Sequence, residues 1–203
     1  MGLVSDVRRL QKSPISKVVR KRLAEFKRLG KSDDWFSELC FCILTANSKA
    51  RTAIAIQKKL GAKGFSSMSE KRLAKSIREH KHRFHNNKAS YICLARKSGN
   101  LKAILLNERE PREWLVDNVK GLGWKEASHF LRNIGYMDYA ILDRHILALM
   151  LNDRLIAKRP KTLNKKAYLE IERKLRKVAG KLKISLAELD LYMWYMKTGE
   201  VLK

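Results

Sequence analysis

The chain has 203 residues, enough for one large domain or two small ones, and 45% of them are hydrophobic, which excludes a disordered polypeptide. Its 45 Lys and Arg residues against 20 Asp and Glu give a formal net charge of +25, and an excess of that size normally has a polyanion such as nucleic acid as its counterpart. No apolar run approaches the ~20 residues of a membrane-spanning helix, and the amino terminus lacks the apolar core of a signal peptide. We therefore expect a cytoplasmic protein, associated with the nucleoid through DNA, that has no membrane contact.

The cysteines and histidines do not form a recognisable metal site. Cys40 and Cys42 are one residue apart within an apolar segment, and Cys93 stands alone. The three histidines in residues 80–85 lie among lysines and arginines, without carboxylate or thiolate partners at ligand spacing. We expect no disulfide framework, no metal and no organic cofactor.

Apolar residues recur at helical spacing along the whole chain, and strand alternation is nearly absent. This pattern predicts an all-α protein of about nine helices joined by short loops, with Gly30 as the left-handed cap that closes the first of them. The expected starting signals, in chain order, are Ser13-Pro14, the run Ser32 to Asp34, Ser48, a capping box of Ser67 and Glu70, Asn86 or Asn87, Pro111, Trp124, Asp143, a stripe around Tyr168, and a second capping box of Ser185 and Glu188.

The most informative connection is Lys120-Gly121-Leu122-Gly123, between two predicted helices. Glycine lets the backbone turn tightly and approach a partner without an intervening side chain. The amide groups and partial positive charge at the start of the second helix favour a phosphate. These features predict a helix-hairpin-helix that binds the DNA backbone without reading sequence, and the alternative is an ordinary turn between helices.

Lys125 and Asp143 are the candidate catalytic pair. Lys125 lies in the first turn after the hairpin, where the helix dipole and partial burial both disfavour a charged ammonium, and a Schiff-base nucleophile must be a neutral amine. Asp143 follows an apolar approach through residues 139–142, and a carboxylate near a glycosidic carbon can stabilise positive charge on the sugar. Taken singly, Lys125 could be a surface lysine and Asp143 a plain helix N-cap.

The order of hairpin, lysine and aspartate resembles the helix-hairpin-helix superfamily of DNA glycosylases, which includes endonuclease III. The chain is more closely similar to the archaeal and thermophile-type second family of 8-oxoguanine DNA glycosylase/AP lyases. Five stretches carry this resemblance: 41–47, 83–84 with 87–89, 120–132, 140–145, and 190–195 with the final Lys203. The endonuclease III branch is disfavoured because its iron–sulfur cluster needs four cysteines, and none follows Cys93.

The resemblance implies two helical subdomains with a cleft between them. We expect one to span residues 31–138, with the hairpin at about 112–134, and the other to combine 1–30 with 139–203. The implied site residues are Lys125 and Asp143 as the catalytic pair, Lys120, Gly121, Gly123 and Asn47 at the DNA, Arg83 and Phe84 in the loop that fills the gap left by an extruded base, and Trp194 and Lys203 at the lesion. For Phe84 an aromatic wedge would replace lost base stacking, although a core phenylalanine is the alternative. For Trp194 the alternative is likewise a core side chain.

The implied function is that of a bifunctional DNA-repair enzyme. It removes 8-oxoguanine from double-stranded DNA through a Schiff base on Lys125, cleaves the strand by β-elimination, and acts as a monomer. Two alternatives remain at this point: a glycosylase of the same fold for another lesion, and a non-enzymatic helix-hairpin-helix protein that only binds DNA. A ribosomal or RNA-binding protein is a third and weaker alternative, because exposed basic tails are scarce.

Overall fold

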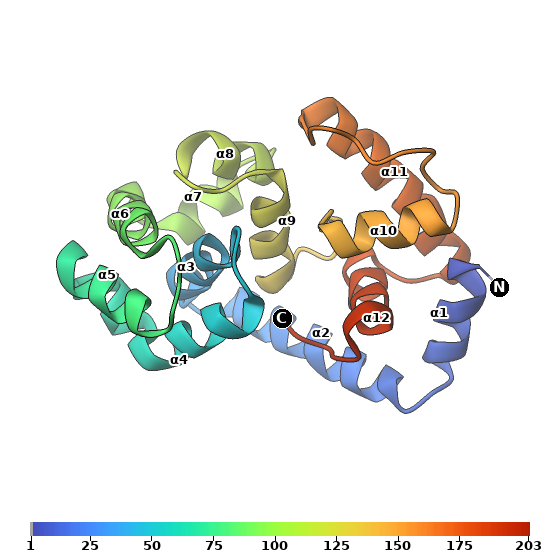
Figure 1. Cartoon of the computed structure of the whole chain (residues 1–203), viewed down its shortest axis with the longest axis horizontal. Helices are drawn as coiled ribbons and strands as arrows, with labels where there is room; N and C mark the ends of the chain where they lie inside the picture. The colour runs from blue at the N-terminus through green and yellow to red at the C-terminus, as the bar shows by residue number, and fades with distance from the viewer. Residues whose placement is uncertain (1) are drawn as a thin grey trace. The chain divides into compact units, whose positions relative to one another are not determined.

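The computed structural model describes residues 2–203, and within them it contains helices and no strand, which confirms the predicted all-α fold (Figure 1). The described residues form twelve α-helices and one 3₁₀ helix, η1. Their bounds are α1 Leu3–Gln11, α2 Ile15–Lys31, α3 Trp35–Thr45, α4 Ala50–Ser67, α5 Glu70–Glu79, α6 His85–Ala95, η1 Arg96–Ser98, α7 Leu101–Asn107, α8 Pro111–Asn118, α9 Trp124–Asn133, α10 Arg144–Asn152, α11 Lys165–Leu182 and α12 Leu186–Thr198.

The expected number of about nine helices is too low, because two short helices carry weak sequence signals. α1 buries only Leu3 and Val7, so it has no extended apolar stripe. α7 has seven residues and buries Leu101 and Leu105, which is about two turns. Periodicity is difficult to recognise over so short a segment, and packing against neighbouring helices decides the outcome.

Several expected helix ends are also wrong. Gly30 lies inside α2 and does not cap it, and Asn86 and Asn87 lie within α6. Ser67 is the last residue of α4, and the N-cap of α5 is Ser69, whose hydroxyl accepts a hydrogen bond from the Arg72 amide. Lys49 takes the N-cap position of α4 in place of Ser48. Around Ser48 and Ser67 several polar residues stand close together in the sequence, so the apolar periodicity does not select among them.

The structure divides into two compact units. One unit combines the chain up to Arg28 with residues 131–203, and the other runs from Leu29 to Phe130. The two passages of the chain between them fall within α2 and α9. The domain boundaries expected from the sequence, after residues 30 and 138, remain a prediction.

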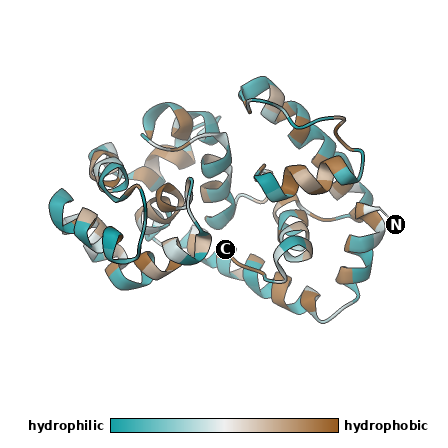
Figure 2. Ribbon diagram, in the orientation of Figure 1, coloured by the Kyte–Doolittle hydropathy of each residue, from teal (hydrophilic) through white to brown (hydrophobic). Residues whose placement is uncertain are grey.

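The unit 29–130 is built around α3. This helix is buried on every side, with ten of its eleven residues inaccessible to solvent, and it is largely hydrophobic in Figure 2. It packs against α4, α6 and α7, while α5 packs on α4 and α6. Its one buried acid, Glu38, accepts a hydrogen bond from Gln57 Nε2 at 3.1 Å. A helix that is apolar all round requires neighbours on all sides, and this helix has them.

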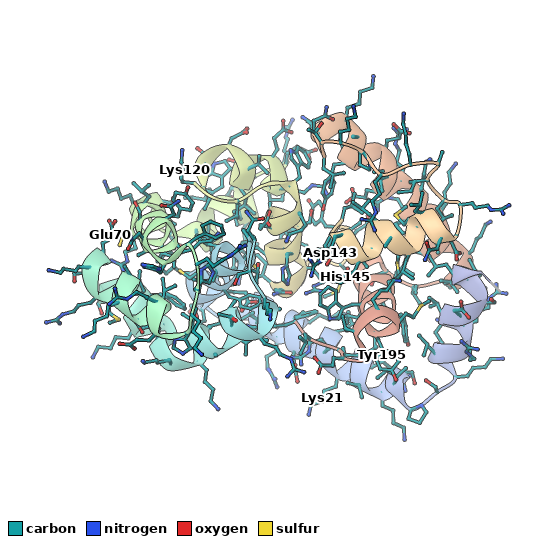
Figure 3. The ribbon with its side chains drawn as sticks, in the orientation of Figure 1. Lys21, Glu70, Lys120, Asp143, His145 and Tyr195 are labelled. Atoms are coloured by element: carbon teal, nitrogen blue, oxygen red, sulfur yellow. The ribbon has the colours of Figure 1, made fainter. Side chains whose placement is uncertain are left out.

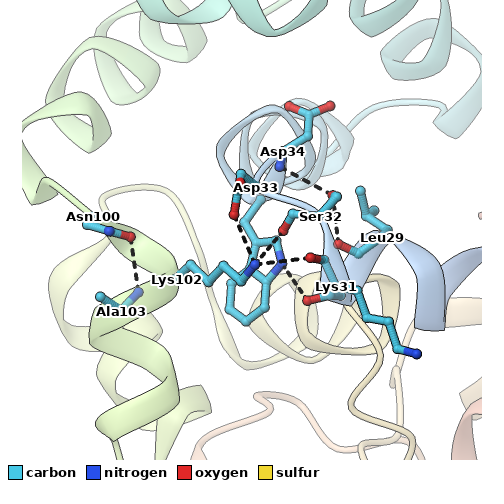
Figure 4. Close-up of polar contacts among 10 residues, drawn as sticks. Leu29, Lys31, Ser32, Asp33, Asp34, Asn100, Lys102 and Ala103 are labelled. Atoms are coloured by element: carbon cyan, nitrogen blue, oxygen red, sulfur yellow. Dashed lines mark hydrogen bonds and ion pairs between the residues drawn. The ribbon is translucent and has the colours of Figure 1, made fainter.

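Lys102 of α7 fastens the segment between α2 and α3 (Figure 4). Its ammonium donates hydrogen bonds to the carbonyl oxygens of Lys31, at 3.2 Å, and Ser32, at 2.9 Å, and forms an ion pair with Asp33 at 3.0 Å. The same ammonium lies 5.9 Å from the ring centre of Trp35. Lys102 therefore satisfies carbonyl groups at the end of α2 that have no partner within the helix.

The unit formed by the two chain ends is organised around α12. This helix packs against α1, α10 and α11, and α1 also packs against α11. Seven residues of α12 are buried, and α11 presents a buried stripe that includes Tyr168, Ile171, Leu175 and Val178. Across residues 2–203, no helix combines the length and the apolar character that crossing a membrane would require.

Replacing Lys102 with methionine should lower the free energy of unfolding by about 1.5 kcal/mol, because it removes charged hydrogen bonds to backbone carbonyls. The ion pair with Asp33 should contribute little, since that carboxylate is 99% exposed. Urea denaturation measures the change. Lys97→Met, at an exposed position of η1, is the matched control and should stay within about 0.5 kcal/mol of the parent protein. Equal stabilities for the two variants would contradict the fastening role.

Candidate active site and DNA-contacting elements

The predicted hairpin is present between α8 and α9, and its turn depends on Gly121. This residue has a φ of +91°, which side-chain-bearing residues rarely adopt. A methyl group on Gly121 would lie 2.4 Å from Cδ2 of Tyr91, so the ring of Tyr91 packs directly on the glycine. Lys120, Gly121 and Gly123 are all exposed, and Lys120 is labelled in Figure 3. The turn therefore presents backbone and one ammonium to solvent.

Arg112 ties the two helices of the hairpin together. Its guanidinium is buried, donates to the Ser128 hydroxyl at 3.2 Å, and lies 4.8 Å from the ring centre of Trp124. The Ser128 hydroxyl in turn donates to the Trp124 carbonyl at 2.8 Å. Leu122, which is 6% exposed, anchors the turn from the inside. These contacts fix the first turn of α9 relative to α8.

Lys125 lies in that first turn and is half-buried, with 28% of its side chain exposed. Its Nζ lies 2.9 Å from Oε1 of Glu126, whose side chain is 14% exposed. Lys88 of α6 interacts with both groups and is only 5% exposed. Burial lowers the pKa of Lys88 to about 8; Glu126 opposes this shift and Lys125 adds to it. The candidate nucleophile therefore belongs to a group of two amines and one carboxylate.

The buried side chain of His82 links the Arg83–Phe84 loop to the end of α3. Nε2 of this buried imidazole lies 2.9 Å from the Leu44 carbonyl oxygen, and its Nδ1 accepts a hydrogen bond from the Phe84 amide at 3.2 Å. Burial lowers the pKa of His82, which favours the neutral imidazole that this pattern needs. Phe84 is 39% exposed, so the alternative of a core phenylalanine is wrong, and the Arg83 guanidinium carbon lies 5.2 Å from its ring centre.

Asn47 is exposed and lies two residues after the end of α3. Its φ of +59° is in the left-handed region, which asparagine tolerates better than most residues. The Ser48 amide donates to the Thr45 carbonyl at 3.0 Å, which closes the turn around it. The position is suited to a polar contact.

Asp143 is the N-cap of α10, and its two capping hydrogen bonds use one oxygen. Oδ1 accepts from the amides of His145 and Ile146, each at 2.8 Å, so Oδ2 lies outside the cap. The segment leading to it is held by α11. The Tyr168 hydroxyl donates to the Ala140 carbonyl at 2.7 Å, and Glu172 accepts from the Ala140 amide at 2.9 Å. The N-cap interpretation is thus correct, and it still leaves one carboxylate oxygen for chemistry.

His145 and Trp194 stand beside this N-cap. Asp143 and His145 lie together at the start of α10 (Figure 3), and the His145 ring meets the half-buried Trp194 ring edge-on, with centres 5.4 Å apart. Asp190, one turn before Trp194 in α12, is buried and lies 2.5 Å from the Arg132 guanidinium. Burial raises the pKa of Asp190 to about 6; Arg132 opposes the shift, and the charge of Asp143 adds to it.

The carboxy terminus is anchored within the same unit. Val201 is 9% exposed, and its carbonyl accepts from Arg22 at 3.5 Å. Lys203, two residues further, is half-buried. In the same unit, the His145 amide bonds to Asp143 and the His145 ring contacts Trp194.

The predicted site residues fall into two groups. The unit 29–130 holds Lys125 with the hairpin and loop residues Lys120, Gly121, Gly123, Arg83, Phe84 and Asn47, while the other unit holds Asp143, Trp194 and Lys203. The sequence interpretation did not assign roles to Lys88, Glu126, His145 or Asp190. The sequence could have indicated Lys88, because it lies on the same apolar stripe as Ile92 and Ala95. Lysine is rarely buried unless it has a partner. Within residues 2–203, no cluster of three or more His, Cys, Asp or Glu is placed to hold a metal ion.

Comparisons with known proteins identify the class to which this fold and these residues belong. A family model described as 8-oxoguanine DNA glycosylase matches residues 19–184. The 8-oxoguanine DNA glycosylase/AP lyase of Methanocaldococcus jannaschii is 47% identical over 208 aligned residues, which span the whole of both chains.

Two solved structures extend the likeness to three dimensions. The crystal structure of the M. jannaschii 8-oxoguanine glycosylase/lyase in complex with a 15mer DNA containing 8-oxoguanine matches with a TM-score of 0.95 at 46% identity, covering 99% of each chain. That of the 8-oxoguanine DNA glycosylase of Thermotoga maritima gives 0.93 at 44% identity, covering 99% of this chain and 98% of the other. The chain belongs to the 8-oxoguanine DNA glycosylase family, as its sequence predicted.

Gly121→Ala should lower the free energy of unfolding by about 2 kcal/mol, because the new methyl group meets Tyr91 and the backbone keeps a strained φ. It should also weaken binding to undamaged duplex DNA. Gly180→Ala is the matched control, since a methyl group there meets nothing within 4 Å in the last turn of α11; it should be neutral or slightly stabilising. Thermal unfolding measures the change in stability, and a titration with duplex DNA measures the change in affinity. Equal stability and equal DNA affinity of the two variants would contradict the hairpin assignment.

Asp143→Asn and Asp143→Ala should separate the capping function of this residue from its chemical function. Asparagine caps helices about as well as aspartate, so its variant should keep the parent stability, whereas alanine should cost about 1 kcal/mol. Both should slow excision of 8-oxoguanine by about 100-fold or more, because both remove the negative charge. Stability and single-turnover excision rates are measured in parallel. An asparagine variant with the parent rate would reduce Asp143 to a helix cap.

Proposed function

We propose that this member of the family excises 8-oxoguanine from double-stranded DNA and then cleaves the strand by β-elimination, with Lys125 as the nucleophile. It is a DNA-repair enzyme, as predicted. The observation that carries the proposal is the 47% identity to a named 8-oxoguanine DNA glycosylase/AP lyase over the full length of both chains. The alternative of a purely DNA-binding protein does not account for a half-buried lysine paired with a carboxylate directly after the hairpin.

The proposed DNA contacts follow from charge and exposure. The hairpin turn offers backbone amides of Gly121 and Gly123, with the Lys120 ammonium, to phosphates of one strand. Phe84 is an exposed aromatic on a loop fixed by His82, and it would occupy the space vacated by an extruded base. Arg83 keeps a cation beside that ring, near the phosphates and the unpaired base. Asn47 is assigned a polar contact to the same DNA.

The proposed chemistry begins at Nζ of Lys125. Its lone pair attacks C1′ of the damaged nucleotide, the bond from C1′ to N9 breaks, and 8-oxoguanine leaves with that electron pair and takes up a proton. Nζ then loses a proton and its lone pair opens the C1′–O4′ bond; O4′ keeps the bonding pair and takes up a proton, and Nζ and C1′ are joined as a protonated Schiff base. Loss of a C2′ proton expels the 3′ phosphate by β-elimination, and water finally releases the sugar from the lysine.

Asp143 is assigned the carboxylate role in base release. Its charge stabilises the oxocarbenium character that develops at C1′ as the base departs, and Oδ2 can accept a proton from the attacking amine. Oδ1 is committed to the two amides of α10, which hold the carboxylate in one orientation. Tyr168 and Glu172 fix the preceding segment, so the group is positioned before substrate binds.

The proposed lesion contacts are Trp194 and Lys203. 8-Oxoguanine carries an N7–H donor where guanine has an acceptor, so one well-placed acceptor discriminates between them. The terminal carboxylate of Lys203 is the candidate acceptor, and the Trp194 ring is the candidate surface for the base. We further propose that the enzyme is a monomer and that it acts in the cytoplasm on nucleoid DNA.

Borohydride trapping tests the nucleophile. With a labelled duplex carrying 8-oxoguanine opposite cytosine, the parent enzyme should give a covalent protein–DNA band, because borohydride reduces a Schiff base to a stable amine. Lys125→Ala should give none and should lose strand cleavage. Lys63→Ala, at an exposed position of α4, should trap like the parent enzyme. A band of full strength from Lys125→Ala would refute the assignment, and a band only with other lesions would identify a different substrate.

A further inference from the structure

His82 is a buried imidazole to which the proposed reaction assigns no step. It is 3% exposed and lies between the end of α5 and the start of α6. Lys81, directly before it, has a left-handed φ of +57°, and the Lys81 amide donates to the Arg78 carbonyl at 2.8 Å, so the chain turns sharply as α5 ends. Within two residues the chain then passes from this buried ring to Phe84, which is 39% exposed.

One nitrogen of His82 satisfies a backbone carbonyl of α3. The Leu44 carbonyl belongs to the last turn of that helix, where carbonyl groups have no partner within the helix. Leu44 is inaccessible to solvent, and a buried carbonyl needs a donor from elsewhere in the protein. Nε2 of His82 lies 2.9 Å from this oxygen. Since a carbonyl oxygen can only accept, the hydrogen lies on Nε2.

The other nitrogen of His82 is thereby made an acceptor. A neutral imidazole carries one N–H, so Nδ1 presents its lone pair when Nε2 is the donor. The Phe84 amide donates to Nδ1 at 3.2 Å. This bond, to the amide two residues further on, has the form of an Asx turn. The Phe84 carbonyl accepts from the Lys88 amide at 2.9 Å, so both backbone polar groups of Phe84 are bonded.

These bonds matter because the ring of Phe84 is too exposed for core packing to fix it. Its one described ring contact is with the Arg83 guanidinium, whose carbon lies 5.2 Å from the ring centre. The direction of the ring therefore depends on the backbone of Phe84. Asn47, the other exposed residue assigned to DNA in this region, lies three positions after Leu44. His82 thus connects the segment that carries Phe84 to the segment that carries Asn47.

We propose that His82 is a positioning residue for extrusion of the lesion: its two ring nitrogens hold the Phe84 backbone against the end of α3. The inference rests on the role proposed above for Phe84, whose ring fills the gap in the base stack. The ring has to be in place as the damaged base leaves, because it replaces stacking that is lost at that moment. If the Phe84 amide were released, the loop would have to be ordered again at each extrusion, at a cost in conformational entropy.

Two amide substitutions separate the two hydrogen bonds. His82→Gln places an amide nitrogen near the position of Nε2, so it can still donate to the Leu44 carbonyl, but it leaves the Phe84 amide without its acceptor. His82→Asn places a carboxamide oxygen near the position of Nδ1, so it can still accept from the Phe84 amide, but it is too short to reach Leu44. His80→Gln is the matched control, since the half-buried His80 ring contacts only the Ser76 carbonyl within α5 among the described hydrogen bonds.

The order of the two variants should reverse between stability and activity. In thermal unfolding His82→Asn should be the less stable, because it leaves a buried carbonyl without a donor. In single-turnover excision of 8-oxoguanine opposite cytosine, with saturating enzyme, His82→Gln should be the slower variant. Its rate should be about tenfold below that of the parent, the change expected from one lost hydrogen bond. His80→Gln should match the parent in both measurements.

A second duplex separates positioning from a general structural defect. With 8-oxoguanine opposite an abasic site no base pair has to be broken, so extrusion depends less on a ring that is already in place. On this duplex His82→Gln should come within about twofold of the parent rate. A merely structural defect lowers the rate on both duplexes by the same factor.

Equal slowing on the two duplexes would overturn the proposal, as would excision rates that follow the order of thermal stability. If His82→Asn does not fold at the assay temperature, the two rates of His82→Gln decide. A Phe84→Ala variant that excises at the parent rate from both duplexes would reject the role of Phe84, and with it the positioning role of His82. A parent enzyme that excises 8-oxoguanine from neither duplex would instead reject the proposed function.

Discussion

The contact between Gly121 and Tyr91 is the constraint on which the hairpin region depends. A left-handed glycine makes the turn, and the aromatic ring that covers it leaves no space for any side chain at this position. The contact holds Tyr91 of α6 against the turn. Arg112 completes the arrangement from the other side by joining Ser128 and Trp124. The proposed nucleophile is therefore placed by a backbone conformation and two aromatic contacts, none of which involves the lysine itself.

The unit that contains both chain ends holds the carboxylate of Asp143 in place through backbone amides. Backbone amides bind one oxygen of Asp143, and α11 holds the segment before it through Tyr168 and Glu172. Arg132, a buried cation of this unit, pairs with Asp190 and with Asn133. The negative charge of Asp143 is thus supported by dipoles, which fix its position and leave the charge intact.

The sequence predicted the fold class and the family correctly, because both depend on patterns that are local and long. Helical periodicity identified the all-α fold, and the run from Lys120 to Arg132 carried the family. The short helices α1 and α7 were missed because their apolar faces hold two residues each. Helix ends failed where polar residues cluster, as at Ser67 and Ser69, because the choice depends on packing that periodicity does not encode.

The roles of individual site residues are a harder problem. The sequence left open whether Phe84 is exposed and whether Asp143 caps a helix. The structure shows that Phe84 is exposed and that Asp143 caps α10. The roles of both residues at DNA stay predictions. Lys88 could have been noticed as a lysine in an apolar stripe. Its acidic neighbour Glu126, however, is 38 positions away in the chain. Pairings of that kind arise from tertiary packing and carry no local signature.

The anchored loop at Phe84 has a consequence for the DNA contact proposed for this residue. His82 holds the loop to the end of α3 through the Leu44 carbonyl, so the exposed ring is already ordered in the free protein. The conformational entropy of that loop is lost during folding, and it need not be lost again at each encounter with a base pair. The apolar ring meanwhile remains in water, an unfavourable state that burial in a base stack would relieve. In the wedge role proposed for Phe84, a ring that is ordered in this way would test many undamaged base pairs at little entropic cost for each one.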